Sequence, residues 1–323
     1  MDRLRRRCGA PCQLLLVATL LAWSLAPALA QDQGEPPAEQ RRIITIDGSG
    51  GTQSGNLRSG PIVYDHPDAF GIEATVSTLT ILGSHAELTA PAGASITQGG
   101  ARVAAFTGGV RVERGRLSAS GPALTYSEAT GLGVLAGRAD VVVTPEDEAD
   151  ADVRIAADEV AFDVDTDRST STGNVTLVNG QQSAEADTLV YEEDRELAVL
   201  TSAGSQVTIT REDDAGDVTV ITADEIRVLT GAKLLYARGN VTVVDGAITS
   251  TGAQVFFDDN SGIAEVIGAP GAPAKAEDAG TGATLVTDRI QQDVEYDFFE
   301  AIDASVPSAY DAAAFALSGE TAE

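Results

Sequence analysis

The sequence has 323 residues and carries 49 Asp and Glu residues against 21 Lys and Arg residues, a formal net charge of −28. Nucleic-acid binding needs clustered positive charge, so this composition argues against it. Two His and two Cys residues leave little material for a catalytic triad or a metal centre. We therefore expect no enzymatic activity, no metal site and no cofactor.

The first thirty residues have the composition of a cleavable signal peptide. Four arginines between positions 3 and 7 precede an apolar run at 14–25, and Ala28-Leu29-Ala30 supplies small residues for cleavage. Both Cys residues lie in this leader, so the mature chain contains no thiol. We expect export to the periplasm, with 31–42 as a flexible linker after the cleavage site.

Two separate motifs recur at one spacing. Ala157-Asp158-Glu159-Val160 matches Ala223-Asp224-Glu225-Ile226, and Gly173-Asn174-Val175 matches Gly239-Asn240-Val241, both 66 residues apart. An earlier copy, Gly108-Gly109-Val110, precedes the first Gly-Asn-Val by 65 residues. A shared spacing of this kind indicates a structural repeat.

Each repeat divides into halves. The segment 186–191 leads to 204–207 in the order in which 223–226 leads to 239–241, so the basic element has about 30–37 residues. A partial copy begins at 287–290. Within each half, apolar and polar residues alternate with period two, which predicts strands with one dry face. The Gly of each Gly-Asn-Val is expected to have a positive φ or to mark a bulge.

The repeats set the expected domain organisation. We expect on the order of sixteen strands, and a meander of that length must close, fold over into two sheets or wind as a solenoid. The expected segments are repeats at 43–268, a Gly/Ala/Pro-rich loop at 269–283, terminal strands at 284–303 and a C-terminal tail at 304–323.

One acidic stretch begins like a calcium loop. Asp163, Asp165 and Asp167 alternate as in an EF-hand, but Arg168 stands at the sixth position and Asn174 at the twelfth. These departures exclude the EF-hand interpretation. The dry strand faces therefore need another explanation. They either pack together as an ordinary sandwich core or leave space for a hydrocarbon chain, and the residues alone leave both open.

The order of elements resembles the OstA-like domain of LptA-like lipopolysaccharide-transport proteins. An Ala-Asp strand, a polar turn, a Gly-Asn-Val strand and a closing Tyr or Phe occur at 157–191 and 223–257, and more loosely at 101–126. The resemblance implies an antiparallel incomplete β-jellyroll, a V-shaped open sandwich of two layers. It also implies a non-enzymatic periplasmic carrier of lipopolysaccharide or a related amphipathic lipid toward the outer membrane.

The resemblance further implies partners and a site. Members join end to end by strand pairing, so inner- and outer-membrane components with OstA-like domains and self-association are expected. Carried over by position, the lipid-groove candidates are Val175, Leu177, Leu189, Tyr191, Val207, Ile209, Ile226, Val241, Val243 and Phe257. The chain is longer than the small soluble members, and its acidity is unusual for a carrier of an anionic glycolipid. The alternative is a structural or adhesive secreted β-solenoid without lipid cargo.

Overall fold

The computed structural model describes residues 38–147, 149–213, 215–303 and 305–320. The chain divides into two units, 1–35 and 36–323, and all that is described here belongs to the second. The expected signal peptide lies outside the described residues. No helix among the described residues is long and apolar enough to cross a membrane.

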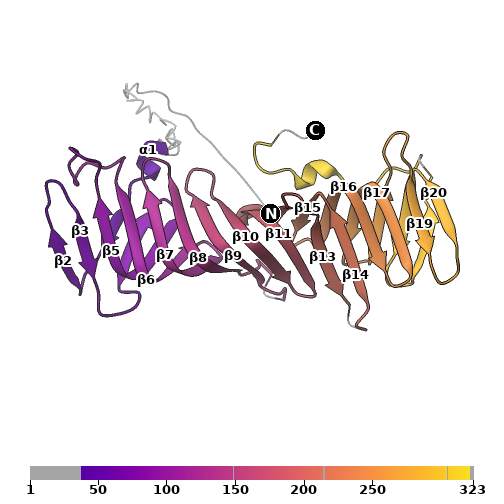
Figure 1. Ribbon diagram of the computed structural model, residues 1–323, viewed down its shortest axis with the longest axis horizontal. Coiled ribbons are helices and arrows are strands. Elements are labelled where there is room, and N and C mark those ends of the chain that lie inside the picture. The colour runs from indigo at the N-terminus through magenta and orange to yellow at the C-terminus, as the bar shows by residue number, and fades with distance from the viewer. Residues whose placement is uncertain (1–37, 148, 214, 304, 321–323) are drawn as a thin grey trace, which may run out of the picture. The chain divides into compact units, whose positions relative to one another are not determined.

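The second unit is all-β, with antiparallel strands in chain order (Figure 1). The first strands are β1 (Thr45–Asp47), β2 (Thr52–Gly55), β3 (Ile62–Asp65), β4 (Ile72–Val76), β5 (Leu79–Thr89), β6 (Val103–Arg114), β7 (Leu117–Ser127), β8 (Leu132–Val143), β9 (Val153–Asp163), β10 (Arg168–Asn179) and β11 (Gln182–Glu192). The later strands are β12 (Leu197–Thr201), β13 (Val207–Glu212), β14 (Val218–Ala223), β15 (Glu225–Leu229), β16 (Leu234–Asp245), β17 (Ile248–Asp258), β18 (Ile263–Ile267), β19 (Ala274–Asp278), β20 (Thr284–Thr287), β21 (Arg289–Asp293) and β22 (Phe298–Ala301). The short helical segments are α1 (Ala38–Arg41) and the 3-10 turns η1 (Glu193–Arg195) and η2 (Ala312–Phe315).

The sheet is folded along one line into two layers. The two halves of β11 pair with different strands, since 182–185 pairs with β13 and 188–192 pairs with β12. The first layer continues through β14 and the second through β15, and both meet again in the two halves of β16. The expected jellyroll-like arrangement of two antiparallel layers is confirmed.

The fold line, which we call the crease, follows an irregularity within the long strands. Four dipeptides with positive φ mark it: Gly108-Gly109, Gly137-Arg138, Gly173-Asn174 and Gly239-Asn240. At Gly173-Asn174 the φ angles are 76° and 46°, and the pairing register shifts between Thr172 and Val175. Two successive left-handed residues turn the strand, so one strand can serve both layers. The expected positive φ of the Gly is confirmed.

The crease also explains why the two motifs recur together. Asn174 Nδ2 donates to Asp158 Oδ2 at 2.7 Å, and Asn240 Nδ2 donates to Asp224 Oδ2 at 2.8 Å. Asn is among the residues that best tolerate the left-handed region. The Asp of the Ala-Asp motif therefore anchors the Asn of the Gly-Asn-Val motif from the neighbouring strand.

In the later half-repeats the strand breaks at the crease instead of bending. The chain changes layer between β12 and β13, where Ala203 N donates to Asp187 Oδ2 at 2.7 Å. It changes layer again between β14 and β15, between β18 and β19, and between β20 and β21. The expectation of about sixteen strands is therefore too low. A continuous strand of 11 or 12 residues is replaced at these places by two short strands, and there are 22 in all among the described residues.

Three segments expected as linker, loop or tail contain regular structure, and only the Ala-rich 308–317 of the tail had a helical pattern in the sequence. The loop expected at 269–283 includes β19, because the chain crosses between layers before it and turns after it. The linker expected at 31–42 includes α1, and the tail expected at 304–323 includes η2. At β19 and η2, burial of Ala274, Ala276 and Phe315 outweighs local composition.

We predict that the crease glycine Gly239 cannot be replaced without loss of stability. A Cβ at this position would lie 2.5 Å from Asp224 Oδ2, and its φ is +78°. Gly239→Ala should lower the free energy of unfolding by about 2–3 kcal/mol. Gly204, with φ +83° and no atom within 4 Å of the place a Cβ would take, is the matched control. Gly204→Ala should cost about 1 kcal/mol in urea unfolding followed by circular dichroism, and equal losses would contradict the role of the close approach between position 239 and Asp224.

Candidate functional site

The ten groove candidates meet between the two layers. Six lie in the first layer, on β10, β13 and the second half of β16: Val175, Leu177, Val207, Ile209, Val241 and Val243. Four lie in the second layer, on β11, β15 and β17: Leu189, Tyr191, Ile226 and Phe257. All ten belong to one hydrophobic cluster, and none is more than 3% exposed.

This shared interior is built mainly of small side chains. Val and Ala make up more than half of the buried cluster, and its aromatic members are few. Side chains fill the space between the layers in this structure, so the ten candidates line a packed interior and not an open groove. Burial raises the pKa of Tyr191 to about 12, and its hydroxyl lies 3.5 Å from Thr230 Oγ1. A ligand could occupy this interior only if the layers separate.

The edge opposite the crease, which we call the margin, is joined by polar contacts. Here the hairpin ends of the first layer face those of the second. The cross-layer contacts are Thr78 Oγ1 to Asp167 Oδ1 at 2.8 Å, Arg116 Nη1 to Glu196 Oε1 at 2.5 Å, Lys233 Nζ to Asp150 Oδ1 at 2.8 Å, Asn179 Nδ2 to the Thr230 carbonyl at 3.3 Å, and Arg211 Nη2 to Glu295 Oε1 at 2.8 Å. The crease is covalent, whereas these margin contacts are hydrogen bonds and ion pairs of side chains.

Near the N-terminal end the chain itself crosses the margin. Arg42 pairs with Asp165 of the second layer, and a few residues later the chain enters β1 of the first layer. Glu128, whose side chain is fully buried, accepts hydrogen bonds from Ile44 N and Arg102. Burial alone would raise the pKa of Glu128, but these donors hold it below its usual value. This end of the margin is therefore the more firmly closed.

A pocket of about 160 Å³ interrupts the margin contacts. Thr78, Arg114 and Gly115 line it from the first layer, and Asp167, Glu193 and Asp194 line it from the second. Arg114 is 5% exposed, and its Nε and Nη2 have no hydrogen-bond partner among the described residues. Glu193 Oε2 lies 3.7 Å from Arg114 Nε, beyond hydrogen-bond range. Burial lowers the pKa of Arg114, and the charge of Glu193 opposes that shift.

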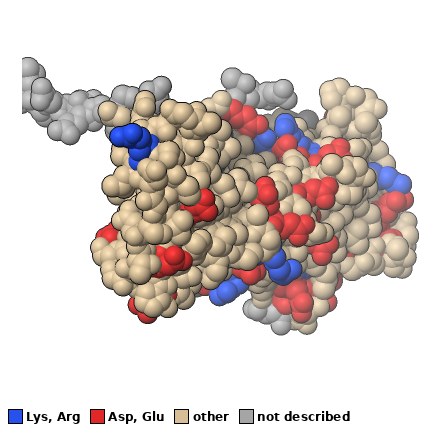
Figure 2. All heavy atoms as spheres, turned by 60° about the vertical axis from the view of Figure 1, so that its left-hand side comes forward, with Lys and Arg blue, Asp and Glu red and all other residues tan. Residues whose placement is uncertain are grey.

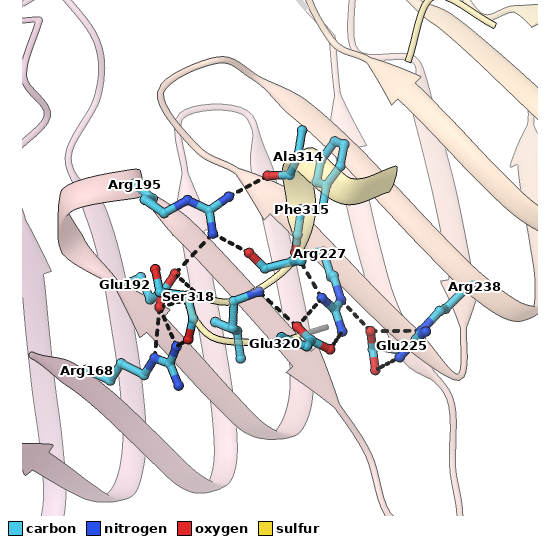
Figure 3. A network of polar contacts seen from close by, with 12 residues as sticks. Arg168, Glu192, Arg195, Glu225, Arg227, Arg238, Ala314, Phe315, Ser318 and Glu320 are labelled. Carbon is cyan, nitrogen blue, oxygen red and sulfur yellow. Dashed lines mark hydrogen bonds and ion pairs between the residues drawn. The ribbon is translucent and has the colours of Figure 1, made fainter. Parts of the chain in front are cut away.

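The C-terminal strap, residues 306–320, lies on the outer face of the second layer. Figure 3 shows how arginines of that face hold its backbone. Arg195 donates to the carbonyls of Ala314 and Ala316, and Arg227 donates to that of Phe315. Glu320 forms a bidentate ion pair with Arg227, in which Nη1 and Nη2 each lie 2.7 Å from a carboxylate oxygen. The strap is thus fixed by charge-assisted bonds to its backbone and to its last described residue.

An aromatic contact supports the same strap. Phe315 is 1% exposed and packs with Tyr236 and Phe256, which alternate with the interior residues of β16 and β17. Tyr310 stacks on Phe256 with ring centroids 5.5 Å apart. The strap therefore covers an apolar patch that is separate from the interior cluster.

The surface retains the acidity of the sequence. Figure 2 shows acidic side chains spread over one face, with basic side chains beside several of them. The sequence did not predict the polar contacts of the margin or those of the strap. Their charged residues lie in turns and on wet strand faces, where the sequence alone indicates only solvation.

Comparisons with known proteins yield one partial likeness worth describing. No protein-family model matches the chain, and no curated protein matches it. Among solved structures it is similar to LptH, described as the LptA homologous periplasmic component of the conserved lipopolysaccharide transport device from Pseudomonas aeruginosa. The two are 16% identical, the match covers 39% of this chain and 87% of LptH, and the TM-score is 0.35. A likeness of this extent identifies neither the cargo nor the partners of this chain.

We predict that the ion pair of Glu320 controls docking of the strap. The hydrogen bond from Arg227 lowers the pKa of Glu320 from 4.5 to about 2. Its contribution is therefore complete above about pH 4.5 and is lost as the pH falls toward 2. At pH 7, Glu320→Gln should speed amide hydrogen exchange in 306–320 by about tenfold, while Glu300→Gln on exposed β22 should not. Unchanged exchange in Glu320→Gln would show that the strap docks without this ion pair, through its aromatic contacts and the bonds from Arg195 and Arg227 to its backbone.

Proposed function

We propose that the chain is a non-enzymatic periplasmic carrier that holds the acyl chains of an amphipathic lipid between its two layers. The cargo is lipopolysaccharide or a related lipid on its way toward the outer membrane. The observation that carries this proposal is the interior itself. One apolar cluster runs between layers that are continuous at the crease. At the margin, beyond the crossing of the chain near β1, the described layers meet through polar contacts such as Arg116 to Glu196 and Lys233 to Asp150.

The energetics of loading depend on the packed state of this interior. Full burial of a twelve-carbon chain is worth roughly 10 kcal/mol at about 0.8 kcal/mol per CH₂, before ordering costs. Part of that gain replaces contacts that the two layers already make with each other, so the net affinity is smaller. Small side chains favour the replacement of layer-to-layer contacts by lipid contacts, because separating small side chains exposes little area per residue.

Free strand edges supply the proposed partner contacts. Among the described residues, β1 and β2 pair on one side only, as do β20 and β22. An unpaired edge can accept a further strand from another chain. We propose that inner- and outer-membrane components with OstA-like domains, or a second copy of this chain, dock there.

A second candidate is a secreted structural β-solenoid without cargo. The burial of all ten candidates favours it, because a closed core needs no ligand. Both candidates have the same fold, so a direct test of binding decides between them.

We predict that a photoreactive residue at Val207 will crosslink to a lipid. Val207 is fully buried between the layers, whereas its neighbour Thr208 points to the opposite face of β13. The variant at 207 should crosslink to at least one of lipopolysaccharide, phospholipid and fatty acid, as judged by mass spectrometry. The variant at 208 is the matched control. Absence of every adduct at 207 would leave the structural solenoid as the function.

We predict that tethering the margin will block loading. Both Cys residues of the sequence precede position 13, so a chain lacking the leader can carry two introduced thiols without interference. Asn179→Cys with Thr230→Cys places one thiol on each layer, next to a contact of 3.3 Å. A reversible bifunctional thiol reagent should abolish lipid uptake, and reduction should restore it. Ser183→Cys with Thr210→Cys tethers register partners within one layer and should leave uptake intact.

A further inference from the structure

The margin pocket is built from both layers at the border of the interior. Thr78, Arg114 and Gly115 come from hairpins of the first layer, and Asp167 and Glu193 come from hairpins of the second. The interior residue Leu117 follows Arg114 by three positions, and the interior residue Val164 precedes Asp167 by three. A group bound in the pocket would therefore sit where the polar margin meets the apolar interior.

Arg114 has donors that the protein leaves unused. It is 5% exposed, and its single hydrogen bond runs from Nη1 to the Arg168 carbonyl at 3.4 Å. Its Nε and Nη2 are buried and have no hydrogen-bond partner among the described residues, and the ion pair of Nε with Glu193 Oε2 is long, at 3.7 Å. A buried guanidinium with unpaired N–H groups is costly, and an acceptor placed in the pocket would remove that cost.

The other lining groups restrict what that acceptor can be. Asp167 Oδ1 accepts from Thr78 and Asp167 Oδ2 accepts from Arg41 Nη2 at 3.2 Å. Glu193 Oε1 accepts from Arg116 N, so Glu193 keeps one oxygen on the side of Arg114. Three carboxylates and one guanidinium line the pocket, and Arg41 beside it pairs with Asp167, so the carboxylates remain in excess and oppose a phosphate or a carboxylate ligand. A hydroxyl group fits best, since it accepts from Arg114 and donates to a neighbouring carboxylate.

The size of the pocket agrees with a small polyol. With a volume of about 160 Å³ the pocket has room for several water-sized groups, and so for a small polyol. We infer that the margin pocket binds a neutral sugar headgroup through Arg114, while the acyl chains of the same lipid lie between the layers. This inference rests on the proposed function and names the class of headgroup that the carrier selects.

The test compares ligands that share a twelve-carbon tail and differ in the headgroup. Dodecyl glucoside, dodecylphosphocholine and lauric acid are titrated below their micellar concentrations into the protein without its leader. The wild type should bind dodecyl glucoside about tenfold more tightly than the other two. Methyl glucoside, which has no tail, should compete with dodecyl glucoside and not with lauric acid.

Two arginine variants separate the pocket from the rest of the margin. Arg114→Met should bind all three ligands with similar affinity, because the tail site remains and the headgroup donors are gone. Arg211→Met is the matched control, since Arg211 is a buried margin arginine whose Nε and Nη2 are paired with Asp259 and Glu295. It should keep the preference for the glucoside.

Each outcome has a distinct meaning. Equal affinities in the wild type, or a glucoside preference that survives in Arg114→Met, overturn the headgroup inference and leave the carrier function standing. Binding of none of the three ligands overturns the carrier function itself. If Arg114→Met does not fold, the wild-type preference and the methyl glucoside competition decide the question without it.

Discussion

The left-handed dipeptides of the crease are the constraint on which the rest of this structure depends. Because Gly239 and Asn240 both take positive φ, β16 turns without ending and supplies a strand half to each layer. The register of both layers is then set by the same chain, and a slip in one would displace the other. The hydrogen bond from Asn240 to Asp224 ties the turn to the neighbouring strand. The two-layered interior forms because these left-handed dipeptides recur in several of the long strands.

The crease and the margin close the two edges of the interior by different kinds of interaction. At the crease the layers share covalent chain, whereas at the margin they share contacts such as Lys233 to Asp150, between side chains that are 42% and 25% exposed. A partly exposed ion pair contributes only about 0–1 kcal/mol. Separation of the layers at the margin is therefore far less costly than at the crease. What resists it is the apolar packing beneath, and that packing is what an acyl chain could replace.

The repeat could be predicted from the sequence, whereas the closure of the interior at the margin could not. Gly173-Asn174 and Gly239-Asn240 could be recognised as turning points because Gly and Asn tolerate positive φ and recur at one spacing. Gly137-Arg138 has the same geometry, but Arg carries no such signal. The margin could not be predicted, since Arg114 and Glu193 are 79 positions apart and each alone resembles a solvated turn residue. The ten interior residues were carried over by position from the family resemblance, and the period-two pattern of their strands marks a dry face without saying whether that face is packed or open.

The distribution of charge bears on the cargo more than the net charge does. The chain has 21 Lys and Arg residues. Several of the buried arginines form ion pairs with carboxylates, as Arg211 and Arg227 do. An anionic headgroup would meet a surface of the same sign and would have to displace such a pair. Arg114 is the exception among the buried arginines described, because two of its nitrogens have no hydrogen-bond partner, and carboxylates still surround it. A neutral headgroup is the one chemistry that uses its donors without adding to the repulsion.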